Sequence, residues 1–149
     1  MRSTYRILAY LVAVGVLLQA AAIAFAWFDV IHEVDGGFVL DQDFEGNAGH
    51  VMHGMVGTMG IPVVALLLMF VSFFAKIPGG VTWAGLVLLA VVAQVVLAFL
   101  AFSAPIVGAL HGINALVILR QSLIAASRAA TVGGELRPQV DIAPTDASV

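Results

Sequence analysis

Residues 81–102 read VTWAGLVLLAVVAQVVLAFLAF, an uninterrupted run without a charged side chain. About 20 such residues are needed to cross the roughly 30 Å of hydrocarbon in a bilayer. Three other stretches, residues 7–28, 51–75 and 106–126, have comparable length and character. Of the 149 residues, 62% are hydrophobic and 10% are charged, whereas soluble domains carry about 25% charge. We therefore predict an all-α integral membrane protein, folded as one up-down bundle of four spanning helices.

Charged residues are distributed unevenly between the ends of these stretches. All six basic residues lie at the amino terminus, between the second and third spans, or at and after the end of the fourth. Six of the nine acidic residues lie in one long loop, residues 29–49. Because Lys and Arg are enriched in cytoplasmic segments, this pattern predicts that both termini are cytoplasmic and that the acidic loop faces the other side. Residues 129–149 contain several Gly and Pro and are predicted to form a disordered cytoplasmic tail.

The composition also bears on targeting, redox chemistry and partners. Residues 1–26 resemble a cleaved signal peptide, but their apolar region exceeds the usual length of about 7 to 15 residues. Cysteine is absent, which excludes disulfides, iron–sulfur clusters and covalently attached heme. The chain has no basic patch with interleaved aromatic residues, so nucleic acid is not a predicted partner. The predicted partner of its surface is the lipid bilayer.

Two histidines, His53 and His111, lie inside apolar stretches at matching depth on the second and fourth spans. Ionisable side chains are costly in a bilayer and usually face a bundle interior, so their presence indicates a functional site. Both have small residues at helical spacing: Gly57 follows the first by four residues, and Gly108 and Ala115 flank the second. A flat macrocycle needs that clearance, because its edges lie close against the helix backbone.

Helix direction adds to this prediction. In an up-down bundle the second and fourth spans run parallel and, in the simplest arrangement, lie diagonally opposite. Neighbouring helices pack about 8 to 10 Å apart, so the diagonal is roughly 14 Å, a gap that two imidazoles with an iron ion between them would fill. Iron suits imidazole ligands. We therefore predict one heme b with His53 and His111 as axial ligands, and with Gly112 and Asn114 beside the second ligand.

These motifs resemble those of known membrane heme proteins. The arrangement is similar to four-helix b-type cytochromes, in which parallel diagonal helices supply axial histidines. It resembles more closely one half of heme A synthase, with His53-Gly-Met-Val-Gly57 on the second span and Leu110-His111-Gly-Ile-Asn114 on the fourth. It is also similar to small bacterial membrane proteins with four spans. The resemblance covers roughly residues 5–126. It implies a bacterial plasma-membrane protein that serves in electron transfer or heme handling.

Departures from these families limit the predicted chemistry. The chain has one half of the heme A synthase pattern, has no acid within spans two to four, and lacks the second histidine pair of di-heme cytochromes. One heme is therefore expected, and a stand-alone enzyme is not the first prediction. The loop side offers no Lys or Arg, so heme propionates would rely on the amino-terminal ends of spans two and four, with His50 as an added donor.

A cofactor-free accessory subunit is the first alternative. Gly54, Gly57 and Gly60 are also the small residues that close helix packing uses. The histidines would then bond to polar neighbours, for which the candidates are Gln19, Gln94 and Asn114. Small-residue faces also permit homo-oligomers, and a redox partner or a larger membrane complex is compatible with the heme prediction.

A metal site in the acidic loop is the second alternative. Its candidate ligands are His32, Glu33, Asp35 and His50. Residues 41–46 resemble the first half of an EF-hand calcium loop, but the twelfth position falls on Met52 instead of the glutamate that the motif requires. The commoner explanation for such a loop is a solvated segment whose charge satisfies topology.

Overall fold

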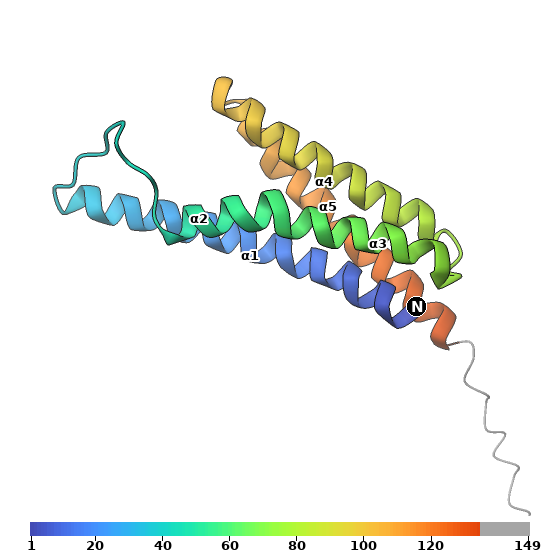
Figure 1. Cartoon of the computed structure of the whole chain (residues 1–149). Helices are drawn as coiled ribbons and strands as arrows, with labels where there is room; N and C mark the ends of the chain where they lie inside the picture. The colour runs from blue at the N-terminus through green and yellow to red at the C-terminus, as the bar shows by residue number, and fades with distance from the viewer. Residues whose placement is uncertain (135–149) are drawn as a thin grey trace, which may run out of the picture.

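The computed structural model describes residues 1–134, and these residues are helical without a β-strand. The elements are α1 Arg2–Asp35, α2 Ala48–Met55, the π-helical turn η1 Val56–Gly60, α3 Ile61–Ala75, α4 Gly80–Ser103 and α5 Val107–Gly134 (Figure 1). Because α2, η1 and α3 follow one another without a break, they form a single rod. The four resulting helices are each long and apolar enough to cross a membrane, which confirms the predicted all-α architecture.

The four helices pack as a ring in chain order. α1 packs against α2, α3 and α5, while α4 packs against α3 and α5. α3 and α5 therefore occupy opposite corners, as predicted for the second and fourth spans. The amino terminus of α1 and the carboxyl end of α5 lie at one end of the bundle, which we call the terminal end (Figure 1). The other end carries residues 36–47 and is called the loop end.

The core lies in the half of the bundle nearest the terminal end. Its largest fully buried side chains include Tyr5, Leu68 and Ile118, and much of the remainder is alanine and valine. Small side chains let helix backbones approach closely, which favours packing where lipid removes the hydrophobic driving force. The Tyr5 hydroxyl donates to the Gly80 carbonyl oxygen over 2.9 Å, and this bond joins α1 to the start of α4.

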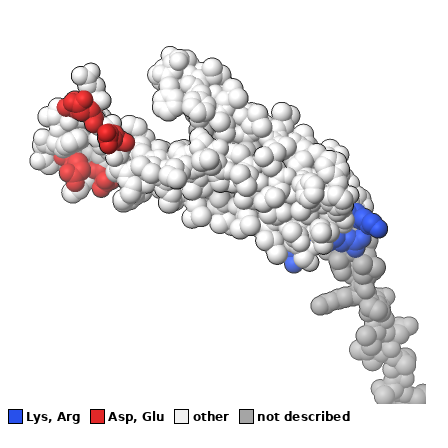
Figure 2. Space-filling view, in the orientation of Figure 1, with Lys and Arg blue, Asp and Glu red and all other residues white. Residues whose placement is uncertain are grey.

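Beyond this core the helices separate into two arms. The first arm is formed by α2 and the loop-end part of α1, and the second by the parts of α4 and α5 that adjoin the turn between them. Figure 1 shows the two pairs diverging toward the loop end, and Figure 2 shows a hollow between them. We call this hollow the inter-arm cleft. It places an open space at the end of the bundle where the histidines were predicted to lie.

The acidic loop is shorter than predicted. α1 continues to Asp35, so the residues between the helices are 36–47, whereas the predicted loop is residues 29–49. The helix continues because no Gly or Pro follows Trp27 until the Gly36-Gly37 pair. At the other end of the loop Asn47 caps α2: its Oδ1 accepts from the backbone N–H of Gly49 over 3.1 Å and of His50 over 3.3 Å.

The last helix is longer than predicted. α5 runs to Gly134, so it includes residues 129–134 at the start of the predicted tail. Ala129 and Ala130 are the strongest helix formers and extend the helix past the last apolar turn until Gly133 and Gly134. The remainder of the predicted tail, residues 135–149, lies outside the described residues.

The surface is apolar along the bundle and charged at its ends. Large side chains such as Phe70, Phe99 and Leu116 are each more than 60% exposed along its length. Figure 2 shows acidic side chains gathered at the loop end and basic side chains at the terminal end. An exposed apolar surface of this extent marks a region that contacts another apolar phase, which for four long helices is compatible with a membrane bundle.

Candidate functional site

His53 and His111 face each other across the bundle. His53 lies on α2 and His111 on α5, both partly buried, and their ring centroids are 6.2 Å apart with the ring planes at 62°. A transition metal lies about 2.0–2.1 Å from a ligating imidazole nitrogen, which is itself about 1.2 Å from the ring centre, so two imidazoles on one metal have centres about 6.4 Å apart. The observed spacing is close to that of two imidazoles on opposite sides of one metal ion, and in the structure the two rings form an edge-on contact.

The ring of His53 is fixed by the backbone of α1. Its Nδ1 lies 3.1 Å from the carbonyl oxygen of Gln19. A carbonyl oxygen only accepts, so Nδ1 carries the proton and Nε2 has the free lone pair. Within residues 1–134, Nε2 makes no hydrogen bond. Metal-ligating histidines commonly use one ring N–H in this way, because a bond to a backbone carbonyl sets the tautomer and orients the other nitrogen.

His111 has the same backbone bond and an additional side-chain partner. Its Nδ1 lies 3.0 Å from the carbonyl oxygen of Gln94 on α4, and its Nε2 lies 3.1 Å from Nε2 of the same glutamine. The Asn114 Nδ2 donates to the Gln94 Oε1 over 2.7 Å and to the Ala90 carbonyl oxygen over 2.8 Å. Of the partners that the sequence offers for a packing histidine, Gln94 bonds to His111 directly, and Asn114 bonds to Gln94.

Gln19 differs from Gln94 although both are glutamines inside a span. Its side chain is 7% exposed, and neither its Nε2 nor its Oε1 has a hydrogen-bond partner among residues 1–134. The contact to His53 comes from its backbone alone. The predicted amide bond of Gln19 to a neighbouring helix is therefore not formed in the described structure.

The glycines around the histidines have two different environments. A Cβ added to Gly54 or Gly112, the residues that directly follow the two histidines, would meet nothing within 4 Å. At Gly57 it would lie 3.0 Å from the Gln19 Oε1, and at Gly108 it would lie 3.8 Å from the Ala101 Cβ. Gly57 and Gly108 therefore face neighbouring helices, and open space adjoins Gly54 and Gly112. The sequence signal for this open space is the His-Gly pair, which occurs on both helices.

A π-helical turn follows His53. In η1 the backbone N–H of Ile61 bonds to the carbonyl oxygen of Val56, five residues earlier. We attribute this π-turn to Pro62, because proline has no N–H to continue the α-helical hydrogen bonds and its ring crowds the preceding turn. Single π-turns inside α-helices occur frequently at functional sites, and this one separates the arm that carries His53 from the packed helix α3.

His50 has a structural role in the first arm. Its ring lies edge-on to Trp27, at 5.1 Å between centroids, and to Phe44, at 5.8 Å. Its Nδ1 accepts from the backbone N–H of Asn47 over 3.3 Å and completes the capping box of α2. Because Nδ1 accepts, the proton lies on Nε2, which is buried and has no hydrogen-bond partner among residues 1–134, so the predicted propionate donor is unpaired but enclosed by its aromatic neighbours.

The alternative metal site in the loop does not assemble. Among the described residues, no group of three or more His, Asp or Glu side chains is arranged to hold a metal ion. His32, Glu33 and Asp35 line a shallow pocket at the end of α1, whereas His50 packs on Trp27 instead.

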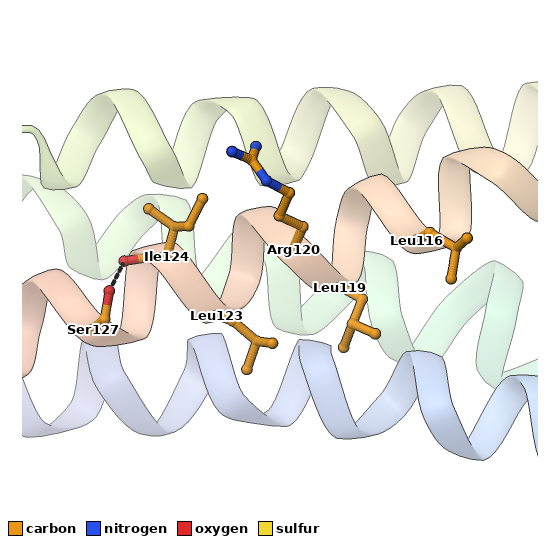
Figure 3. Close-up of a pocket in the computed structure, with 6 residues that line it drawn as sticks. All are labelled: Leu116, Leu119, Arg120, Leu123, Ile124 and Ser127. Carbon is orange, nitrogen blue, oxygen red and sulfur yellow. Dashed lines mark hydrogen bonds between the residues drawn. The ribbon is translucent and has the colours of Figure 1, made fainter.

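A separate groove lies on α5 toward the terminal end (Figure 3). It is lined by Leu116, Leu119, Arg120, Leu123, Ile124 and Ser127. The Ser127 hydroxyl donates to the Ile124 carbonyl oxygen of its own helix over 2.8 Å, so this polar group is already paired. The groove contains neither histidine, and it is shallow and apolar apart from Arg120. We regard it as a feature of the exposed apolar surface of the bundle.

Comparison with protein-family models, with curated proteins and with solved structures found no match to this chain. The proposal below therefore depends on the two histidines and their surroundings.

Proposed function

We propose that this protein is a b-type cytochrome-like membrane protein that binds one heme between His53 and His111 and serves in electron transfer or heme handling. The observation that carries the proposal is the pair of imidazoles, 6.2 Å apart between ring centroids on diagonally opposite helices. The backbone bonds at Nδ1 support it, because they orient both rings and leave Nε2 of His53 without a hydrogen-bond partner among residues 1–134, whereas Nε2 of His111 lies 3.1 Å from the side-chain amide of Gln94. Open space adjoins Gly54 and Gly112, which directly follow the two histidines, and we propose that this space takes the flat ligand.

Two histidine ligands restrict the chemistry. A heme iron with both axial positions filled by protein supplies one-electron transfer and leaves no position for a small substrate. His53 and His111 would hold the iron, and the carbonyl oxygens of Gln19 and Gln94 would keep their rings oriented. A redox protein, or a larger membrane complex, is the proposed partner. The acidic loop end favours a partner of positive charge.

The absorption spectrum tests this function. Protein purified in mild detergent from heme-replete cells is expected to be red, with a Soret band that sharpens and shifts on reduction with dithionite. A pyridine hemochromogen assay should identify heme b at about one equivalent per chain. A helical but colourless protein at full heme supply would contradict the proposal. It would favour the cofactor-free accessory subunit, for which the bond between Gln94 and His111 is the supporting observation.

The proposed location is the bacterial plasma membrane, with both termini in the cytoplasm. The separation of basic from acidic side chains along the bundle supports this orientation, because Lys and Arg are enriched on the cytoplasmic side. The chain has no cysteine, so single-cysteine variants report it directly. In intact spheroplasts a membrane-impermeant maleimide should label Asp43→Cys, and it should label Ser3→Cys only after permeabilisation. The reverse labelling pattern would overturn the orientation.

A further inference from the structure

The hydrogen bonds around His111 have a fixed direction. The Ala90 carbonyl oxygen only accepts, so the group of Asn114 that faces it over 2.8 Å is the NH2. The same NH2 donates to Gln94 Oε1, and the amide of Gln94 therefore turns its own NH2 toward His111 Nε2. Nε2 accepts that bond, so the proton of the imidazole is on Nδ1, where it donates to the Gln94 carbonyl oxygen. All four bonds agree on one tautomer.

The two histidines are therefore unequal as ligands. Nε2 of a neutral imidazole has one lone pair, and at His111 the Gln94 NH2 already uses it. At His53 no hydrogen-bond donor among residues 1–134 occupies Nε2. A metal can bind His53 directly, whereas it can bind His111 only after the Gln94 side chain has moved away.

We propose that Gln94 is a positioning residue that acts as a latch: its side-chain amide covers His111 Nε2 until the heme iron has bound His53, and then rotates away. This inference rests on the proposed function. The movement does not release the ring, because Nδ1 stays bonded to the backbone carbonyl oxygen of the same residue. Gln94 is only partly buried, so its side chain has room to change rotamer. Asn114, anchored on Ala90, sets the closed position.

The first test uses the protein without heme. In histidine-labelled protein in detergent, the 15N resonances should show both histidines protonated at Nδ1. Gln94→Leu should shift the Nε2 resonance of His111 and leave that of His53 unchanged, because it removes the donor and keeps the backbone carbonyl. Gln19→Leu is the matched control: the same change in the glutamine next to His53 removes an amide without a hydrogen bond among residues 1–134. An unchanged His111 resonance in Gln94→Leu would overturn the latch.

The second test follows heme uptake by rapid mixing. Wild-type protein should show a fast high-spin phase, in which His53 is the ligand, and a slower conversion to the low-spin spectrum. Gln94→Leu should speed the second phase about two- to tenfold, the factor expected for removing one neutral hydrogen bond, and Gln19→Leu should not. Asn114→Ala, which frees the amide of Gln94, should speed it less and serves if Gln94→Leu does not fold.

The two tests together distinguish failure of the latch from failure of the proposed function. If no variant takes up heme, the proposed function is wrong, and the resonances still show whether Gln94 covers His111. If wild-type protein binds heme in the low-spin form and Gln94→Leu converts at the same rate, the latch is wrong and the heme site stands.

Discussion

Alanine in place of either His53 or His111 should reduce the bound heme about tenfold or more and abolish the low-spin spectrum. Loss of groups that only orient a metal ligand already costs about 10- to 100-fold in affinity, so loss of the ligand itself should cost at least as much. Each substitution leaves the iron with one protein ligand, and His53→Ala should have the larger effect, because the amide of Gln94 covers Nε2 of the remaining His111. The measurement is heme content per chain together with the Soret position of the reduced protein.

His32→Ala is the matched control for both variants. His32 is an exposed histidine near the end of α1, outside the facing pair, so its replacement should leave heme content and spectrum unchanged. Exogenous imidazole sharpens the comparison. It can enter the space vacated by the missing side chain and should restore the low-spin spectrum of His53→Ala or His111→Ala. An unchanged spectrum in either variant would assign the ligand elsewhere, and failure of imidazole rescue in both would indicate a packing role.

The positions of the helices could be predicted because lipid imposes a simple requirement. A span needs a minimum length of apolar residues, and four such stretches in series place the second and fourth on parallel helices. The contacts of α1 and α4 then confirm the diagonal placement of α3 and α5. The ends of the helices could be predicted less well. Residues 29–35 carry acidic side chains, which indicate solvent, yet nothing in them stops the helix that enters from the span.

The surroundings of the histidines could be predicted only in part. His53 and His111 could be predicted as site residues because ionisable groups are costly in lipid, and the structure brings the two rings together. The contact of Gly57 with Gln19 could not be predicted, because the spacing argument assumes an unbroken α-helix. Gly57 lies in η1, where five residues instead of four separate bonded groups, so it turns toward Gln19.

The separation of the two arms could not be predicted from the hydropathy of the sequence. Side chains exposed on the surface of the bundle and side chains that face a neighbouring helix are both largely apolar in this chain, so the extent of packing cannot be counted from them. The extent of the core depends on where small residues of neighbouring helices lie against each other. Alanine contacts concentrate in the half nearest the terminal end, whereas the first arm relies on the close contact of Gly49 with α1.

Gly49→Ala is the second substitution with a large expected effect, because it acts on that contact. An added Cβ would lie 2.7 Å from the Ala22 carbonyl oxygen and 2.9 Å from the Ala26 Cβ. The first of these is backbone, so α2 itself must shift away from α1. Overpacking of this kind costs about 1–3 kcal/mol. The shift also lengthens the bond from His53 to Gln19, so both thermal stability and heme content should fall.

Gly85→Ala on α4 separates this effect from the general consequence of replacing a helical glycine. Its added Cβ would meet nothing within 4 Å, and alanine is favoured over glycine inside a helix by about 0.5–1 kcal/mol, so this variant should be as stable as wild type or more so. Thermal unfolding of both variants in the same detergent, followed by helicity and by Soret absorbance, gives the comparison. Equal stability of Gly49→Ala and wild type would show that the first arm is not held by the α1–α2 contact. A loss of heme without a loss of stability would place the effect of Gly49 on His53 alone.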